Sequence, residues 1–595
     1  MPAPRNESAQ GVTGDSLRAA EGRDRGDLGS GDVVGECERV LAEHRALDRC
    51  VSIEPRRRED QQADLRLLFG DRTWLQSPAG DELIAALAEH PALTSAQRHK
   101  SAILLRFDDA VLAGLERRLA TAEIAGMKTS DVLDGHRFTV GFVGPNTNKA
   151  LHVGHMRNIL LGHALASALE SAGATVRRHS VVGDIGRRVC EAMGGYLTHH
   201  DGEDPQTRGL AGDRFVELCS RDFPREPTQS TAIGQADDPN AEESEARGDL
   251  ADTIMQAWLR GAAPERALWR RLRDWALTGQ ELTLARLGVR MDRYDFESEG
   301  LQRARDLVAK GLDVGMFERS ATGAVIYRTG RSEYTTMVLV RTDGAPTEYA
   351  RLLGVYHRML EDLDPGAVYV ELAGIEWQPA IAVLSELLAA LLESPRDDLY
   401  TCVFHGSVTV GGEKMGSSTG EVMWVDDLLD EVAAGPGVAA LQELAHGAAG
   451  REELADMVVR GTFLCSPAAQ PLAFAFERLE GPPGAGWTIA EAWCRALAPR
   501  KPVGTAPIAR TAVVQSQLYR RSLLRAAEKR DASSLATYLL GLSEACLLAP
   551  EPGPAAAPVL RRVLGSLGFL VGDQQPRLRD GRQTRHGNHR HPVEA

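Results

Sequence analysis

Two histidines three residues apart, His152 and His155, stand in the segment GPNTNKALHVGHMRN, residues 144–158. The pattern that follows predicts a helix, so this spacing places both imidazoles on one face at its N-terminus. Free backbone N–H groups and the helix dipole favour an anion there, and Gly154 lets a ligand approach the backbone. Lys149 adds positive charge just upstream. These residues could hold a triphosphate and stabilise the charge that develops when its α-phosphorus is attacked.

The elements around this segment must place it at the edge of a sheet. The sequence predicts a strand, a loop, a helix and a second strand in the order 137–142, 146–154, 155–171 and 175–182. Such βαβ units are right-handed with parallel strands, so the loop lies at the carboxyl edge, where α/β folds bind ligands. Further strands are predicted at 366–374 and 400–410, with a helix between them at 379–392.

An isolated pair of histidines at this spacing could also bind a metal or be an accidental surface pair. The sequence contains no GxxxxGK[ST] phosphate loop, no HExxH motif and no glycine-rich dinucleotide fingerprint. We therefore expect a nucleotide site of another kind and no protein-bound metal.

The letters around the histidines resemble the HIGH motif of class I aminoacyl-tRNA synthetases. The string PNTNKALHVGHMRN, with VVGDIG at 181–186, resembles the arginyl-tRNA synthetases in particular. Similarity continues in LGVRMDRYDFESE at 287–299 and in GGEKMGSSTGEVMWVDDLLDE at 411–431, which is similar to the KMSKS loop. The resemblance implies an ATP-dependent ligase that uses Mg²⁺, forms an aminoacyl-adenylate and transfers the aminoacyl group to tRNA. Arginine is the amino acid it implies.

The resemblance also assigns roles to single residues. The catalytic residues at the phosphates would be His152, His155, Lys149 and Lys414. The second lysine of KMSKS is Ser417 here, and Lys149 would replace its charge. Nucleotide contacts would come from Gly154, Asn146, Asp184, Met415, Ser417 and Ser418, where Asp184 could instead order its loop. Amino-acid contacts would come from Asn146, Glu348, Tyr349, Glu376 and Gln378.

The expected amino-acid pocket departs from that family at two acidic positions. A glutamate is expected at the position of Gly141. An aspartate is expected at Leu352, or at Leu353 if Tyr349 takes the tyrosine role. A guanidinium buried without its carboxylate costs about 3–5 kcal/mol.

Three functions therefore stay open. Glu348 or Glu376 could supply the lost charge, which favours an arginine–tRNA ligase. Without it, the pocket would favour a smaller or more apolar amino acid, as in a paralogue that serves a biosynthetic pathway. The third possibility is a tRNA-binding protein that has lost catalysis.

Composition limits the setting in which the chain works. Its 595 residues are 43% hydrophobic and 25% charged, which is typical of a soluble protein with several domains. The net charge of −15 requires a local basic surface for any nucleic acid, and we expect Tyr519 and the arginines of 510–530 to provide it. Eight scattered cysteines and the lack of a long apolar run predict a cytoplasmic protein without a membrane segment. We expect a monomer.

The predicted fold class is α/β. It combines a class I synthetase Rossmann-type parallel-sheet catalytic domain with a small N-terminal α/β appendage and a C-terminal all-helical bundle. The predicted boundaries are a disordered segment at 1–55, the appendage at 56–130, the catalytic domain at 131–430 with a flexible acidic insertion at about 224–250, the helical tRNA-binding domain at 431–574 and a disordered tail at 575–595.

Overall fold

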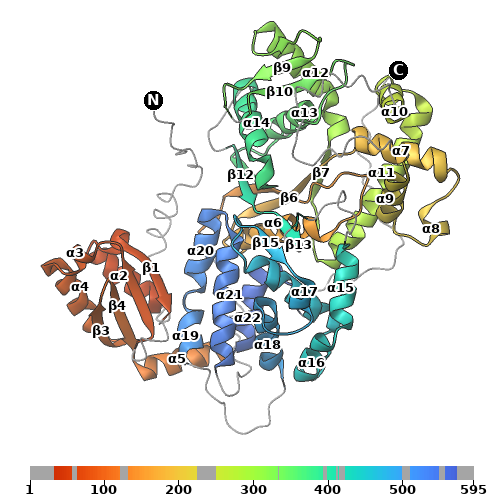
Figure 1. The fold of residues 1–595 in the computed structure, drawn as a ribbon. Helices are drawn as coiled ribbons and strands as arrows, with labels where there is room; N and C mark the ends of the chain where they lie inside the picture. The colour runs from red at the N-terminus through yellow and green to blue at the C-terminus, as the bar shows by residue number, and fades with distance from the viewer. Residues whose placement is uncertain are drawn as a thin grey trace.

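Three regions make up the chain in the computed structural model (Figure 1). They are a small N-terminal domain, a central domain built on a parallel sheet, and a helical domain that packs beneath it. The structure describes residues 33–55, 63–120, 132–223, 250–332, 334–392, 399–410, 413–414, 423–498, 510–548 and 556–571. The predictions for 1–32, for the insertion at 224–249 and for the tail at 575–595 lie outside the described residues.

The N-terminal domain is an antiparallel sheet of order β1-β2-β4-β3 with helices packed on it. Its elements are α2 (Val33–Glu43), η1 (Leu47–Arg49), β1 (Cys50–Pro55), β2 (Leu65–Phe69), α3 (Arg72–Leu75), α4 (Pro78–Ala88), β3 (Leu93–His99), β4 (Ala102–Phe107) and α5 (Asp109–Ala120). The predicted disorder of 1–55 is wrong for residues 33–55. Val34, Cys37 and Leu41 recur at helical spacing and are buried, which gives α2 an apolar face that the polar composition conceals.

The central domain is built on five parallel strands in the order β12-β11-β5-β6-β7. They are β5 (Arg137–Gly141), β6 (Thr175–Val182), β7 (Arg293–Phe296), β11 (Ala367–Gly374) and β12 (Tyr400–His405). The predicted βαβ unit and the predicted strand at 366–374 are confirmed. The predicted strand at 400–410 is divided at Gly406, and its second part is β13 (Val408–Val410). Strand order reverses between β5 and β11, and α/β folds bind ligands at such a switch point.

The helices of this domain are α6 (Val153–Ser171), α7 (Arg187–His199), α8 (Pro205–Arg208), α9 (Gly212–Asp222), α10 (Leu250–Leu259), α11 (Ala263–Arg286), α12 (Glu297–Asp313), α13 (Glu348–Glu361) and α14 (Gln378–Leu391). Helices α6, α12, α13 and α14 pack on the parallel sheet, and α7, α9, α10 and α11 pack mainly on one another. A small antiparallel sheet joins them, formed by β8 (Glu318–Arg319), β9 (Val325–Arg328) and β10 (Thr336–Val340).

The helical domain follows, as the sequence predicts. Its helices are α15 (Val425–Ala434), α16 (Pro436–Leu444), α17 (Arg451–Leu464), α18 (Ala485–Leu497), α19 (Arg510–Ser516), α20 (Tyr519–Lys529), α21 (Ala532–Leu547) and α22 (Ala556–Ser566). The short elements between these helices are β15 (Leu472–Phe474) and η5 (Phe476–Leu479). β15 pairs with β13 of the preceding domain, which is itself paired with β14 (Glu413–Lys414), so the two domains share a small sheet.

Helix α6 lies between the two large domains. It packs on the sheet on one side and on α17, α20, α21 and α22 on the other, so its residues are apolar nearly all round. The buried polar residues of α6 are Arg157, His163 and Ser167, and Arg157 is fully buried. Its Nη2 donates to the carbonyl oxygens of Pro467, Ala468 and Gln470 at 2.6, 3.2 and 2.9 Å. These bonds fix α6 to the segment that precedes β15 in the helical domain.

The basic segment at 510–530 also joins domains. Nε and Nη2 of Arg510 each lie 2.6 Å from a carboxyl oxygen of Asp64, and Arg510 also pairs with Asp109. Arg521 pairs with Glu38. These two arginines hold the N-terminal domain against α19 and α20. Their ion pairs argue against the predicted role, in which they contact tRNA phosphates.

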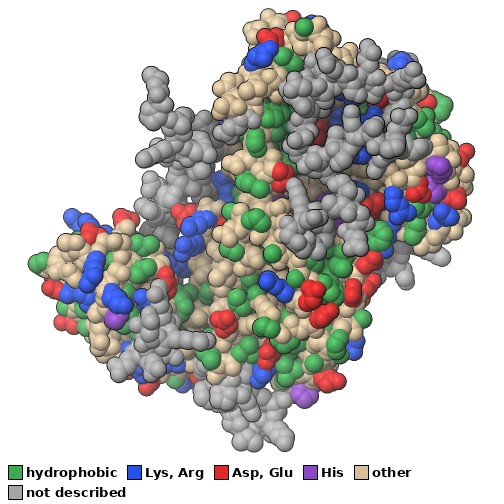
Figure 2. All heavy atoms as spheres, viewed as in Figure 1, with side chains coloured by type: hydrophobic (Ala, Val, Ile, Leu, Met, Phe, Trp, Pro, Cys, Tyr) green, Lys and Arg blue, Asp and Glu red, His purple; other side chains and the backbone are tan. Residues whose placement is uncertain are grey.

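Tyr519 is likewise used inside the protein. Its side chain is buried, and its hydroxyl lies 2.5 Å from the Ser566 hydroxyl, so it does not present a ring for base stacking. In the view of Figure 2, basic side chains on the N-terminal domain alternate with acidic ones and form no continuous basic surface. Within the described ranges, no helix combines the length and the apolar character needed to cross a bilayer.

Candidate active site

The loop after β5 leaves the sheet through an unusual backbone. Val143 has φ +79°, which is rare for a β-branched residue. Its N–H donates to Oδ1 of Asn158 on α6 at 2.7 Å, and the N–H of Gly144 donates to the Ser180 hydroxyl at 3.3 Å. Strained backbone persists only where its surroundings fix it, and it is frequent at ligand sites.

The next residues of this loop are held from two sides. Nε2 of Gln280 on α11 donates to the carbonyl oxygens of Asn146 and Lys149 at 3.2 and 2.9 Å. The N–H of Thr147 donates to the carbonyl oxygen of Gly183 at 3.1 Å. A Cβ on Gly183 would lie 2.1 Å from Oδ1 of Asn146, so glycine is needed for the Asn146 side chain to lie there.

His152 and His155 cap the start of α6. Nδ1 of His152 accepts from the N–H of Gly154, and Nδ1 of His155 accepts from the N–H of His152, both at 3.1 Å. The ring centroids are 3.8 Å apart. Burial, with the nearby charge of Lys149, lowers the pKa of His152 to about 3 and that of His155 well below its usual value. Both imidazoles are therefore neutral at pH 7, with the proton on Nε2.

This arrangement corrects the prediction that free helix N–H groups bind the anion. The N–H of Val153 donates to the Met423 carbonyl at 3.0 Å, and that of His155 to the His152 carbonyl at 2.8 Å. The Gly154 N–H is taken by His152. Among the described residues, none bonds to Nε2 of either histidine. The donors offered to an anion are thus two Nε2–H groups.

Lys149 lies near this pair and within range of the charges of two carboxylates. Burial lowers its pKa, Glu217 and Glu348 oppose that effect, and Arg188 adds to it. Oε2 of Glu217 accepts from Nε1 of Trp424 at 2.9 Å, which fixes the carboxylate in place. The charge of Lys149 therefore acts on the histidine pair and is itself influenced by Glu348 at the start of α13.

The KMSKS-like loop ends close to the histidine pair. Lys414 pairs through its backbone with Thr409, and Trp424 forms a β-bridge with His152. The side chain of Lys414 and the residues Met415, Ser417 and Ser418 lie outside the described residues. Their predicted contacts stay predictions, but the end of the loop is tied to the histidine pair.

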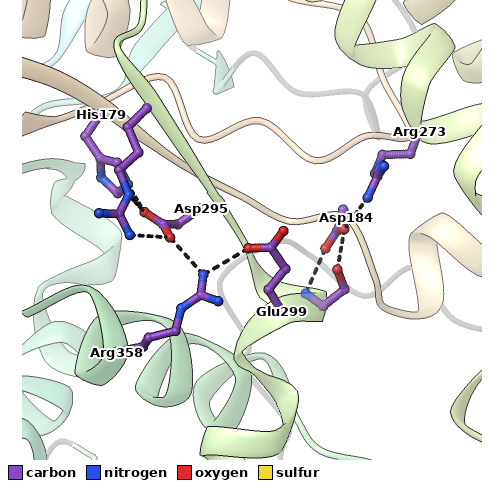
Figure 3. A network of polar contacts seen from close by, with 8 residues as sticks. His179, Asp184, Arg273, Asp295, Glu299 and Arg358 are labelled. Atoms are coloured by element: carbon purple, nitrogen blue, oxygen red, sulfur yellow. Dashed lines mark hydrogen bonds and ion pairs between the residues drawn. The ribbon is translucent and has the colours of Figure 1, made fainter. Parts of the chain in front are cut away.

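Asp184 does not face the open part of the site. Its oxygens accept from the backbone N–H and the hydroxyl of Ser298 at 2.9 and 2.6 Å, and Arg273 lies 3.8 Å away (Figure 3). The carboxyl group is fully buried, which raises its pKa to about 6 against the effect of Ser298. This geometry favours the alternative role, in which Asp184 orders its loop, over contact with a nucleotide.

A second polar cluster lies next to Asp184 in Figure 3. Oδ2 of Asp295 lies 2.8 Å from Nε2 of His179, and Oδ1 accepts from Arg358 of α13 at 2.8 Å. Burial opposes ionisation of Asp295, but hydrogen bonds from His179 and Arg293 outweigh it and lower the pKa. Arg358 also reaches Glu299 at 3.0 Å. The cluster fixes α13 against β6 and β7.

The predicted amino-acid contacts lie on α13 and after β11. Glu348 opens α13, and the buried Tyr349 packs edge-on to Tyr334. Leu352 packs into an apolar cluster, so that position holds no carboxylate. The remaining two predicted residues, Glu376 and Gln378, are exposed at the carboxyl end of β11, and their contact with substrate stays a prediction.

Comparisons with known proteins agree with this arrangement. The family described as "tRNA synthetases class I (R), catalytic domain" matches residues 121–207. The arginine–tRNA ligase of Amoebophilus asiaticus is 31% identical over 299 residues, 50% of each chain, and that of Treponema denticola is 31% identical over 306 residues, 51% of this chain and 49% of the relative. Over about half of its length, the chain is therefore similar to arginine–tRNA ligases. It spans about half the length of the curated relatives it matches.

Solved structures show that the synthetase-like fold extends further. The arginyl-tRNA synthetase of Thermus thermophilus superposes with a TM-score of 0.61 at 19% identity, over 90% of this chain and 96% of that one. That of Plasmodium falciparum gives 0.62 at 10% identity, over 90% and 98%. The predicted fold class is confirmed.

Two features of the synthetase-like site were not predicted from the sequence. Nε of Arg351 donates to Oε2 of Glu297 at 2.6 Å; burial raises the pKa of Glu297 to about 7, although Arg351 opposes this. Glu371 lies beside Gly141 in the sheet. The sequence gives one indication of the role of Glu371, because this acidic residue interrupts the apolar strand AVYVELAG.

Proposed function

We propose that this chain is an arginine–tRNA ligase, which activates arginine with ATP and transfers the arginyl group to tRNA. The observation that supports this most directly is the pair of neutral imidazoles, His152 and His155, beside Lys149 at the carboxyl edge of a parallel sheet. The names of the relatives that match about half of the chain support the same activity.

The residues present suit the phosphates of ATP, which would bind as its Mg²⁺ complex. Two Nε2–H donors and one ammonium group can each bond a phosphate oxygen. Lys414 would approach the pyrophosphate end from its loop, with Met415, Ser417 and Ser418 as further contacts. Gly154 leaves space beside the backbone for the nucleotide.

In the first step, a carboxylate oxygen of arginine attacks the α-phosphorus. An O–P bond forms, the bond from that phosphorus to the bridging oxygen breaks, and pyrophosphate leaves with the electron pair. Negative charge grows on the phosphate oxygens, where donors already in position stabilise it most. Since both imidazoles are neutral, Lys149 supplies the positive charge and the histidines supply hydrogen bonds.

In the second step, a terminal ribose hydroxyl of tRNA attacks the adenylate carbonyl carbon and AMP leaves. The tRNA would lie along the helical domain and the N-terminal domain. On α20, Arg525 and Lys529 are exposed and one helical turn apart, so they are the basic residues we assign to phosphate contacts in place of Arg510 and Arg521.

The test is exchange of labelled pyrophosphate into ATP with each of the twenty amino acids, with and without total tRNA, followed by charging of tRNA. We expect exchange and charging with arginine alone. Silence with all twenty would reject the ligase and leave tRNA binding as the activity to measure.

A second candidate is a paralogue that activates another amino acid for a biosynthetic pathway. Gly141 and the packing of Leu352 in an apolar cluster favour it. Exchange with a single amino acid other than arginine in the same assay would establish it.

A further inference from the structure

Gly141 and Glu371 are direct neighbours where the sheet changes its strand order. They are paired across the parallel strands β5 and β11, at the carboxyl edge. Five residues after Gly141, the same loop carries Asn146, which we assign to the backbone end of the bound amino acid. A side chain that runs from Asn146 back toward the sheet would therefore meet Glu371.

The space beside Gly141 is taken by side chains of β11. A Cβ on Gly141 would lie 2.1 Å from the hydroxyl oxygen of Tyr369 and 2.7 Å from Oε2 of Glu371. No other residue fits at 141 unless these groups move. Because Gly141 has no side chain, the carboxyl group of Glu371 on the neighbouring strand occupies the space beside it.

This carboxyl group is met by hydroxyl groups, and by no cation among the described residues. Oε2 of Glu371 is buried, and within the described part of the chain no hydrogen bond of ordinary geometry reaches that atom. The hydroxyls of Tyr369 and Tyr356 donate to the carboxyl group, which partly offsets the effect of burial on its pKa, and the Tyr369 hydroxyl lies 3.0 Å from Nδ1 of His179. No lysine or arginine of the described ranges forms an ion pair with it. A buried carboxylate in such surroundings is stabilised most by a cation that also donates hydrogen bonds to it.

Helix α13 provides the wall that leads to it. Glu348, Leu352 and Tyr356 are spaced by four and share one face of the helix. From Glu348, near Lys149, to Tyr356, beside Glu371, the helix rises about 12 Å. Leu352 lies halfway along. This surface suits a side chain with an apolar stem and a charged end. It is longer than a small side chain could span.

We propose that Glu371 binds the cationic end of the substrate side chain, a guanidinium, while Leu352 contacts its methylene stem. This inference rests on the proposed function and gives its specificity a structural source. A guanidinium can place two N–H groups on one carboxylate, which would give Glu371 the cationic partner that the described residues do not supply.

The test compares Glu371→Gln with the matched control Glu453→Gln. Glu453 is also buried and accepts from Nε1 of Trp493 at 3.0 Å, but it lies in the helical domain. We measure the KM for arginine in pyrophosphate exchange, the affinity for ATP, and the preference for arginine over citrulline, its uncharged analogue. For Glu371→Gln we expect a KM raised about 100-fold, an unchanged ATP affinity and loss of the preference. Glu453→Gln should keep all three.

An unchanged preference for arginine in folded Glu371→Gln would overturn the proposal. If that variant does not fold, Glu371→Asp keeps the charge and shortens the reach, and the proposal requires a raised KM with the preference retained.

Exchange by the native chain with another cationic amino acid would refute the arginine assignment but keep the role of Glu371. Exchange with a neutral one would refute Glu371 and keep the ligase. If no exchange occurs, calorimetry with arginine decides: binding by the native chain and not by Glu371→Gln supports the proposal, and any other result overturns it.

Discussion

The two ends of the site are assembled from different kinds of structure. His152, His155 and Lys149 stand in one loop and the start of the helix that follows it. Glu371, Leu352 and Tyr356 come from a strand and a helix that meet only in the folded chain. The proposed phosphate end therefore depends on local geometry, and the proposed amino-acid end depends on how β5, β11 and α13 are packed. The chemistry can stay fixed at one end while the substrate side chain is selected at the other.

The largest effect should come from Lys149→Ala. The neighbouring histidines are neutral, so this substitution removes the positive charge beside them, and we expect adenylate formation to fall at least about 1,000-fold. Binding of arginine, measured by calorimetry, should stay within about threefold, because Lys149 belongs to the other end of the site. Lys310→Ala, at an exposed position on α12, is the control. Near-normal exchange by Lys149→Ala would remove this lysine from the mechanism.

His152→Asn should separate capping from catalysis. The asparagine oxygen can accept from the Gly154 N–H as Nδ1 of His152 does, but it presents no donor in place of Nε2–H. We expect the melting temperature to be kept and kcat for exchange to fall about 100-fold. His152→Ala should show the same loss of kcat together with about 1 kcal/mol less stability. A normal kcat in His152→Asn would mean that the ring serves only as a cap.

Binding of arginine should tighten as the pH rises through 7. Burial raises the pKa of Glu371 to about 7, so its carboxyl is neutral at pH 6 and ionised at pH 8. The groups that face it are Tyr356, Tyr369, Tyr400 and Cys402, all with a pKa raised by burial and neutral in this range. His179 contacts Tyr369 and Asp295. Below pH 7 we expect the Kd to fall by up to about tenfold for each unit that the pH rises. Above pH 7 we expect the Kd to level off. Calorimetry across this range measures it.

The same profile for Glu371→Gln identifies the titrating group. Its affinity should be weak and flat between pH 6 and 8. Glu297 also has a pKa of about 7, so a dependence that persists in Glu371→Gln would assign the titration to Glu297 instead.

The smallest effect should come from Leu352→Asp. With the guanidinium on Glu371, a carboxylate at 352 would lie against the methylene stem, and we expect the KM for arginine to rise about three- to tenfold. A lower KM would instead place the guanidinium beside α13 and contradict the role given to Glu371.

Local patterns predicted more of this molecule than distant ones did. The strand, loop and helix from 137 to 171 follow from apolar periodicity, and the histidine pair follows from its spacing. The occupied N–H groups of α6 did not, because the spacing does not specify which way each imidazole turns. The place of Glu371 depends on the register between β5 and β11, which are over 200 residues apart in the chain. The helix at 33–43 was missed because averaging over a polar segment hid its few apolar positions.

Helix α6 carries the histidine pair at one end and the helical domain along its side. It packs on the sheet and on α17, α20, α21 and α22, and Arg157 donates to carbonyl groups of the segment before β15. Without the helical domain, the apolar surface of α6 would therefore be exposed to solvent. In terms of cooperativity, the two large domains form a single unfolding unit, and damage to the helical bundle reaches the phosphate site through the helix that both share.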